Sequence, residues 1–158
     1  MTVDNATAES VDVITDALST ASRLLVAVSA RSIALVDETI AIPQFRALVI
    51  LSNEGPVNLA RLAGLLDVQP STTGPMVDRL VSAGLIDRRP PTNSRRELVA
   101  ELTAHGRELV QQVTAHRRRE IARIVDKLPS GERRGLVGAL TAFSAAGGEP
   151  PTHVDADV

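Results

Sequence analysis

Residues 85–101 restrict the fold of this chain more than any other segment. Residues 85–89 and 95–101 have the composition of strands, whereas the run Pro-Pro-Thr-Asn-Ser between them has no helix potential. The sequence therefore predicts a β-hairpin with an exposed, proline-stiffened tip and a pair of arginines on each arm. Helical periodicity prevails on both sides, so we expect a mainly α fold with one small β element.

A long first helix is predicted over residues 9–38. Its apolar stripe recurs at steps of three and four and is interrupted by one serine: Val11, Ile14, Leu18, Ala21, Leu25, Val28, Ser32 and Leu35. Pro43 fits the first turn of a second helix, which the run Asn-Glu-Gly-Pro at 53–56 ends. So long an apolar stripe cannot be buried by one small domain, which predicts a partner element for the first helix.

Two consecutive helices are predicted within residues 58–84. Asn58 is a good N-cap for the first, and Gly84 is placed to cap the second in the left-handed conformation. Pro75 leaves two alternatives for the second helix. It starts at Pro70 and kinks near Pro75, or it starts late, with Gly74 capping and Pro75 in the first turn.

After the hairpin, Thr103 predicts the cap of another long helix, with an inner stripe of Leu109, Val113, Ile121, Ile124 and Leu128. Pro129 and Ser130 end it and start a last helix with Leu136, Val137, Leu140 and Phe143 inward. Three consecutive arginines at 117–119 are expected to be solvated or ion-paired between helices. We expect disorder in residues 1–8 and flexibility in the acidic tail, 148–158.

Composition excludes several classes of function. The chain has no cysteine, so disulfides, thiolate catalysis and thiol redox sensing are excluded. Aromatic residues make up 1%, which argues against stacking on single-stranded nucleic acid. The three histidines are scattered and no glycine-rich phosphate loop is present, so we expect no catalysis, no metal and no cofactor. Without a signal-peptide pattern or about 20 consecutive apolar residues, we expect a cytoplasmic protein with no membrane partner.

The net charge of −2 is unevenly distributed. Residues 1–42 carry two basic and six acidic residues, residues 43–101 carry seven and six, and residues 102–147 carry eight and four. An acidic balance overall does not exclude a nucleic-acid partner, because phosphate contacts need only a local basic surface.

Four segments together resemble the multiple antibiotic resistance regulator (MarR) family over about residues 10–146. They are Pro-Gln-Phe-Arg-Ala-Leu at 43–48, Asn-Leu-Ala-Arg-Leu-Ala at 58–63, Met-Val-Asp-Arg-Leu-Val-Ser-Ala-Gly-Leu-Ile at 76–86, and Leu102-Thr103 with Gly106. The resemblance implies one winged helix-turn-helix domain over 9–147. Within it, 58–84 is the helix-turn-helix, 85–102 the wing, and 9–38 with 103–147 the dimerisation helices.

The resemblance also implies partners. The first, fifth and sixth helices of two copies would intertwine through Val11, Ile14, Leu18, Leu136, Leu140 and Phe143. Two reading helices about 34–36 Å apart would then bind a near-palindromic duplex. A small aromatic or apolar effector would bind between the dimer helices and each winged domain. The polar residues nearby are Arg23, Arg31 and His116, and for each of them a structural role is favoured over effector binding. The regulatory role favoured is that of a repressor whose DNA binding the effector relieves. A role as an activator remains an alternative.

DNA contacts are predicted from the second helix of the helix-turn-helix and from the hairpin. Small polar groups near a helix start can approach base edges and phosphates, and arginines on a hairpin suit the minor groove. The predicted residues are Asn58, Gln69, Ser71, Thr72, Thr73, Arg79, Arg88, Arg89, Arg95 and Arg96. The alternative reading is a solvated amphipathic helix followed by edge strands that their charges protect from aggregation.

Two positions depart from the family pattern. Gly74 and Pro75 stand where the family usually has a polar or basic residue, and Ser94 stands where it has an aspartate that orients Arg96. We therefore predict weaker or altered sequence preference. The same departures favour a second hypothesis, a winged-helix protein-interaction module with weak or lost DNA binding.

Overall fold

The computed structural model describes residues 10–90 and 98–151 of the chain. In these residues the elements are α1 (Val11–Val36), α2 (Ile42–Glu54), β1 (Val57–Asn58), α3 (Leu59–Leu66), α4 (Pro70–Ser82), β2 (Ile86–Arg89), β3 (Val99–Leu102), α5 (Ala104–Val125), α6 (Ser130–Arg133) and α7 (Leu136–Ala146). The prediction of a mainly α fold with a small β-wing is confirmed. Residues 1–8, Ser94, Arg95, Arg96 and most of the acidic tail, about which the sequence also made predictions, lie outside the described residues.

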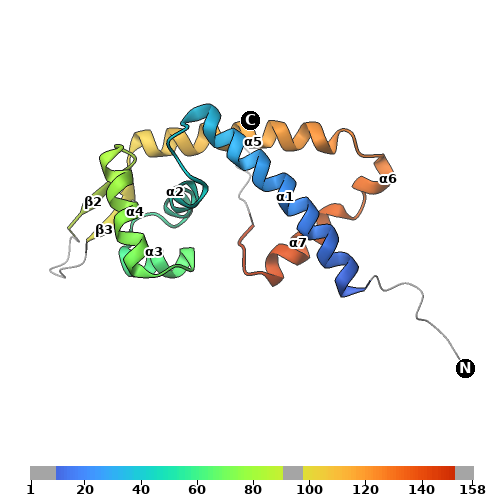
Figure 1. Cartoon of the computed structure of the whole chain (residues 1–158), viewed down its shortest axis with the longest axis horizontal. Helices are drawn as coiled ribbons and strands as arrows, with labels where there is room; N and C mark the ends of the chain where they lie inside the picture. The colour runs from blue at the N-terminus through green and yellow to red at the C-terminus, as the bar shows by residue number, and fades with distance from the viewer. Residues whose placement is uncertain (1–9, 91–97, 152–158) are drawn as a thin grey trace, which may run out of the picture. The chain divides into compact units, whose positions relative to one another are not determined.

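The chain forms two compact units, Met1–Arg118 and Arg119–Val158. The first contains α1 to β3 and the larger part of α5. In it, α3 packs on α4 and α4 packs on β2, so the helix pair and the strand pair lie together (Figure 1). The second unit contains the end of α5 with α6 and α7.

The boundaries of α2 and α3 follow from the predicted capping residues. Pro43 lies in the first turn of α2, and Gly55 ends the helix with a φ of 76° and donates its N–H to the Leu51 carbonyl. The Asn58 side chain accepts the N–H of Arg61 at 2.8 Å, as an N-cap does. All three sequence signals therefore act as predicted.

The helix α4 begins at Pro70 and contains Pro75 in its interior. The alternative in which Gly74 caps a late start is therefore wrong. Since Pro75 has no N–H, the carbonyl of Ser71 receives no helical hydrogen bond from it. At the other end Gly84 has a φ of 75°, and the Leu85 N–H bonds to the Leu80 carbonyl at 3.0 Å, which confirms Gly84 as the left-handed cap.

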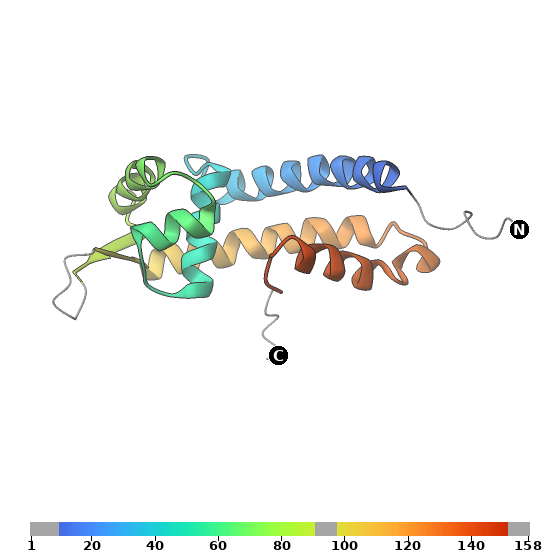
Figure 2. The same ribbon diagram turned by 90° about the horizontal axis from the view of Figure 1, so that it is seen from below.

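Three short antiparallel strands form a sheet in the order β1-β3-β2. Val57 pairs with Ala100, and Arg88 pairs with Ala100 from the other side. The two longer strands, β2 and β3, run side by side (Figure 2). Leu98, which was predicted to belong to the second arm, is exposed and lies outside the strand, because β3 runs from Val99 to Leu102.

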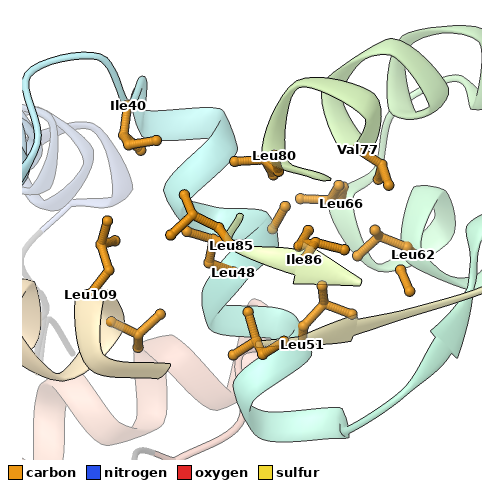
Figure 3. Packing of buried hydrophobic residues seen from close by; sticks show 14 of the residues in the cluster. Ile40, Leu48, Leu51, Leu62, Leu66, Val77, Leu80, Leu85, Ile86 and Leu109 are labelled. Carbon is orange, nitrogen blue, oxygen red and sulfur yellow. The ribbon is translucent and has the colours of Figure 1, made fainter. Parts of the chain in front are cut away.

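The core of the first unit lies between α2, α3, α4 and the sheet. Leu48, Leu62 and Val77 are each 0% exposed, and Ile86 of β2 points into the same cluster (Figure 3). Each such side chain stabilises the fold by roughly 1.5–3 kcal/mol. Because α4 and β2 share this core, their relative position is fixed at the root of the hairpin.

The start of α5 is joined to the corner between α4 and β2. The Thr103 hydroxyl accepts the N–H of Gly106 at 3.0 Å, as an N-cap, and donates to the Gly84 carbonyl at 2.7 Å. The N–H of Thr103 bonds to the Leu85 carbonyl at 3.1 Å. A Cβ on Gly106 would overlap the Leu85 carbonyl oxygen and lie 3.0 Å from Leu102 Cδ2, so only glycine permits this approach.

The second unit corrects the prediction of one continuous last helix. Arg134 is extended and Gly135 is left-handed with a φ of 81°, so the segment is divided into α6 and α7. The Arg133 guanidinium donates to the carbonyls of Leu128 and Asp126, which satisfies acceptors at the end of α5. The side chains predicted to point inward on α7 are exposed in the single chain, up to 78% for Val137.

The helix α1 has 26 residues, of which only Val28, Ser32 and Ile33 are buried. An 18-residue window within it has a mean hydropathy of 1.3, so by length and composition alone α1 could cross a membrane. The helix contains no run of about 20 consecutive apolar residues, and its window reaches this hydropathy although it includes serine and arginine side chains. One such helix is weak evidence for a membrane, because an apolar face that packs on protein has the same composition.

Candidate nucleic-acid interface

One side of α4 faces solvent. Val77 and Leu80 are buried in the core, and the exposed residues lie on the opposite side of the helix: Ser71, Thr72, Pro75, Asp78, Arg79 and Ser82. We call these six residues the α4 face. The predicted contacts Ser71, Thr72 and Arg79 all belong to it. Pro75 lies one turn from each of them and contributes neither a charge nor a hydrogen-bond donor.

Thr73 does not belong to the α4 face. Its side chain is 0% exposed, and its hydroxyl donates to the Gln69 carbonyl at 3.2 Å, within the same helix. The prediction that Thr73 contacts DNA is therefore wrong. The sequence placed it among small polar residues at a helix start, but the rotation of α4 turns this position toward the core.

The other two predicted contacts of the helix-turn-helix lie near the turn. Asn58 is partly buried, and its side-chain oxygen is used to cap α3. Gln69 is exposed directly before α4 and lines a shallow depression with Asp67, Val68 and Thr72, where Ala63 and Gly64 of α3 form the remaining wall. Gln69 is thus accessible, whereas Asn58 has a structural function.

Both hairpin arginines in the described residues are ion-paired. Arg88 NH2 lies 2.7 Å from Asp78 Oδ1 of α4, and Arg89 Nε lies 2.9 Å from Glu101 Oε2 across the sheet. The Arg88 side chain is 30% exposed and that of Arg89 is 66% exposed. Sequence reasoning missed both pairs, because the carboxylates lie ten or more positions away and become neighbours only when the hairpin packs.

A second electrostatic feature lies away from this surface, at the end of α1. Hydrogen bonds from the Thr39 hydroxyl and N–H to Asp37, together with the nearby His105, hold the pKa of the Asp37 carboxyl below its usual value.

Across residues 10–90 and 98–151 no group of three His, Cys, Asp or Glu side chains is arranged to hold a metal ion. The α4 face and β2 offer hydroxyl and guanidinium groups, which suit anionic or polar partners.

A helix-turn-helix whose second helix is followed at once by an antiparallel hairpin defines the winged-helix class of DNA-binding domains. The family model described as the MarR family matches residues 40–98, which include α2 to β2 and end just before β3. The chain belongs to the MarR family, whose members are transcription regulators and not enzymes. The resemblance seen in the sequence is confirmed.

Solved structures and a curated relative agree with this assignment. RV1404 from Mycobacterium tuberculosis is 70% identical, with a TM-score of 0.85 over 92% of this chain and 99% of that one. The MarR family protein RV2887 of the same organism, solved with p-aminosalicylic acid, is 25% identical, with a TM-score of 0.64 over 82% and 97%. The uncharacterized HTH-type transcriptional regulator YfiV of Bacillus subtilis is 24% identical over 104 residues, 66% of this chain, and the match spans 65% of that protein's length.

Proposed function

We propose that the chain is a homodimeric, cytoplasmic transcription regulator that binds near-palindromic duplex DNA, as a repressor relieved by a small-molecule effector. The observation that carries the proposal is the continuity of the α4 face with β2, which the Asp78–Arg88 ion pair joins. A helix and a hairpin held side by side can bind a major groove and the adjacent minor groove together.

The α4 face supplies the proposed groove contacts. Ser71 and Thr72 are exposed in the first turn, where their hydroxyls can donate to a phosphate and the helix dipole favours a negative charge. Arg79 is exposed two turns further on and carries a fixed positive charge. A major groove about 12 Å wide admits a helix with such short side chains near its start.

Arg89 supplies the proposed hairpin contact among the described residues. Its partner Glu101 lies on the same sheet, and the Arg89 side chain is 66% exposed whereas that of Glu101 is 20% exposed. The guanidinium is therefore accessible to a phosphate that would compete with Glu101 for it. Arg95 and Arg96 remain predicted contacts, since the described residues do not include them.

The proposed dimer contact uses apolar side chains that a single chain leaves in solvent. Val11 and Ile14 of α1 are exposed, as are Leu136, Leu140 and Phe143 of α7, and Leu18 is partly exposed. Exposed apolar surface of this extent is typical of protein interfaces. Sedimentation equilibrium should give twice the chain mass, and the double variant Leu140→Glu/Phe143→Glu should give a smaller mass.

The relative RV2887 was solved with p-aminosalicylic acid, which supports an aromatic acid as the effector class. An effector that binds the free protein better than the DNA complex lowers, at saturation, the affinity for the operator by the ratio of its two affinities. Titration of salicylate into the protein–duplex complex should release the duplex. 2-Hydroxybenzyl alcohol, which keeps the ring hydroxyl and lacks the carboxylate, is the matched control and should not release it.

The proposed function is tested by binding to duplexes from the chain's own upstream region across a salt series. A DNA-binding protein loses affinity steeply as salt rises, with a slope of about −0.9 per phosphate contact. Arg79→Gln should weaken binding and lower the slope. Arg123→Gln changes an exposed arginine of α5 that belongs to the second unit and is not a proposed groove contact; it is the matched control and should leave both unchanged.

A protein-interaction module is the second candidate. It is favoured by the neutral Pro75 and the acidic Asp78 on the α4 face, and by the pairing of both described hairpin arginines with carboxylates. A module of this kind would show little duplex binding at any salt concentration.

A further inference from the structure

We propose that Arg88 is a positioning residue, which holds the hairpin against α4 through Asp78 and makes no contact with phosphate. Only the DNA-binding test of this role rests on the proposed function; the test by hydrogen exchange does not. It assigns different roles to two adjacent arginines that the sequence cannot distinguish.

The pleat of β2 separates the two arginines. Successive side chains of a strand point to opposite faces, so Arg88 shares a face with the buried Ile86, and Arg89 shares the other with the exposed Asp87. Arg88 therefore leaves the sheet on the side that packs against α4. Arg89 leaves it on the opposite side, where it meets Glu101 of β3.

The surroundings of Arg88 are those of a constrained side chain. One terminal nitrogen lies 2.7 Å from Asp78 Oδ1, while Nε is buried and has no hydrogen-bond partner. Burying a guanidinium nitrogen without a partner is unfavourable, so the ion pair and the packing of the aliphatic stem must compensate for it. A side chain whose guanidinium is ion-paired and whose Nε is buried must give up both the ion pair and its packing to turn toward a phosphate.

The position along β2 explains what the ion pair does. Ile86 fixes the root of the strand in the core, and Arg88 is the next residue on the same face before the strand ends at Arg89. In β2 the Asp78–Arg88 pair is therefore the link to α4 that lies furthest from the core. It also neutralises Asp78, which is 63% exposed and would otherwise repel phosphates from the α4 face.

The experiment is a double-variant cycle with Asp78→Asn and Arg88→Gln, and a matched control cycle with Arg89→Gln and Glu101→Gln. The first readout is amide hydrogen exchange of β2 and β3 in the free protein. Each of the first two variants should speed exchange about tenfold, and the double variant should add nothing further, because either change removes the same link. Exchange at wild-type rates in Arg88→Gln would overturn the proposal.

The second readout is the salt dependence of duplex binding. Arg88→Gln should lower affinity at every salt concentration and leave the slope unchanged. Arg89→Gln should reduce the slope by about 0.9 for each protomer bound. An equal loss of slope in Arg88→Gln would show a phosphate contact and overturn the proposal. If the wild-type protein bound no duplex, the proposed function would fail, while the exchange cycle would still decide the role of Arg88.

Discussion

Replacing Gly106 by alanine tests the close approach of α5 to the corner between α4 and β2. The added Cβ would overlap the carbonyl oxygen of Leu85, a backbone atom held by its hydrogen bond from Thr103. Overpacking costs about 1–3 kcal/mol. Because the neighbour is a backbone atom that cannot move away, we expect a cost of about 3 kcal/mol. Alanine recovers about 1 kcal/mol through its higher helix propensity. The net loss is therefore about 2 kcal/mol, and a Tm lower by about 4–8 °C.

Thermal unfolding followed by far-ultraviolet circular dichroism is the appropriate assay, since the chain has no Trp and no Tyr for fluorescence. Both proteins must be measured at one concentration, because assembly changes apparent stability. Gly64→Ala in α3 is the matched control. A Cβ there meets nothing within 4 Å, so the control should gain about 0.4–1 kcal/mol. A Gly106→Ala protein as stable as the control would refute the reasoning.

Three further predictions concern single side chains. Pro75→Arg adds a cation to the α4 face and should raise duplex affinity about tenfold in a mobility-shift titration; an unchanged affinity contradicts it. Because the pKa of Asp37 is lowered, its stabilisation is present above about pH 4 and is lost as the pH falls through the lowered value. The difference in Tm between wild type and Asp37→Asn should therefore shrink on acidification, and a constant difference would exclude this cause. Asn58→Ala removes the α3 cap and should cost about 1 kcal/mol in urea unfolding, visible as a lower midpoint.

Local signals predicted most of the first unit. Pro43, Gly55, Asn58 and Gly84 mark helix ends because their backbone chemistry acts within one turn of the chain, without reference to the rest of the fold. The hairpin was predictable for the same reason, since the prolines after Arg89 exclude a helix.

Features that depend on packing were not predictable. The burial of Thr73 is set by the rotation of α4 about its axis, and the link between Asp78 and Arg88 is set by the angle of the hairpin. The break between α6 and α7 depends on Gly135 adopting a positive φ, which glycine permits but does not require. The predicted face of α7 remains exposed in a single chain, so its role depends on a partner.

The hydrogen bonds of Thr103 have a mechanical consequence. This one residue is hydrogen-bonded to Gly84, Leu85 and Gly106, so it joins the corner between α4 and β2 to the first turn of α5. The first turn of α5 and the α4–β2 corner are then expected to move together as a rigid body. A tilt of the first turn of α5 would change the position of the α4 face and of the hairpin.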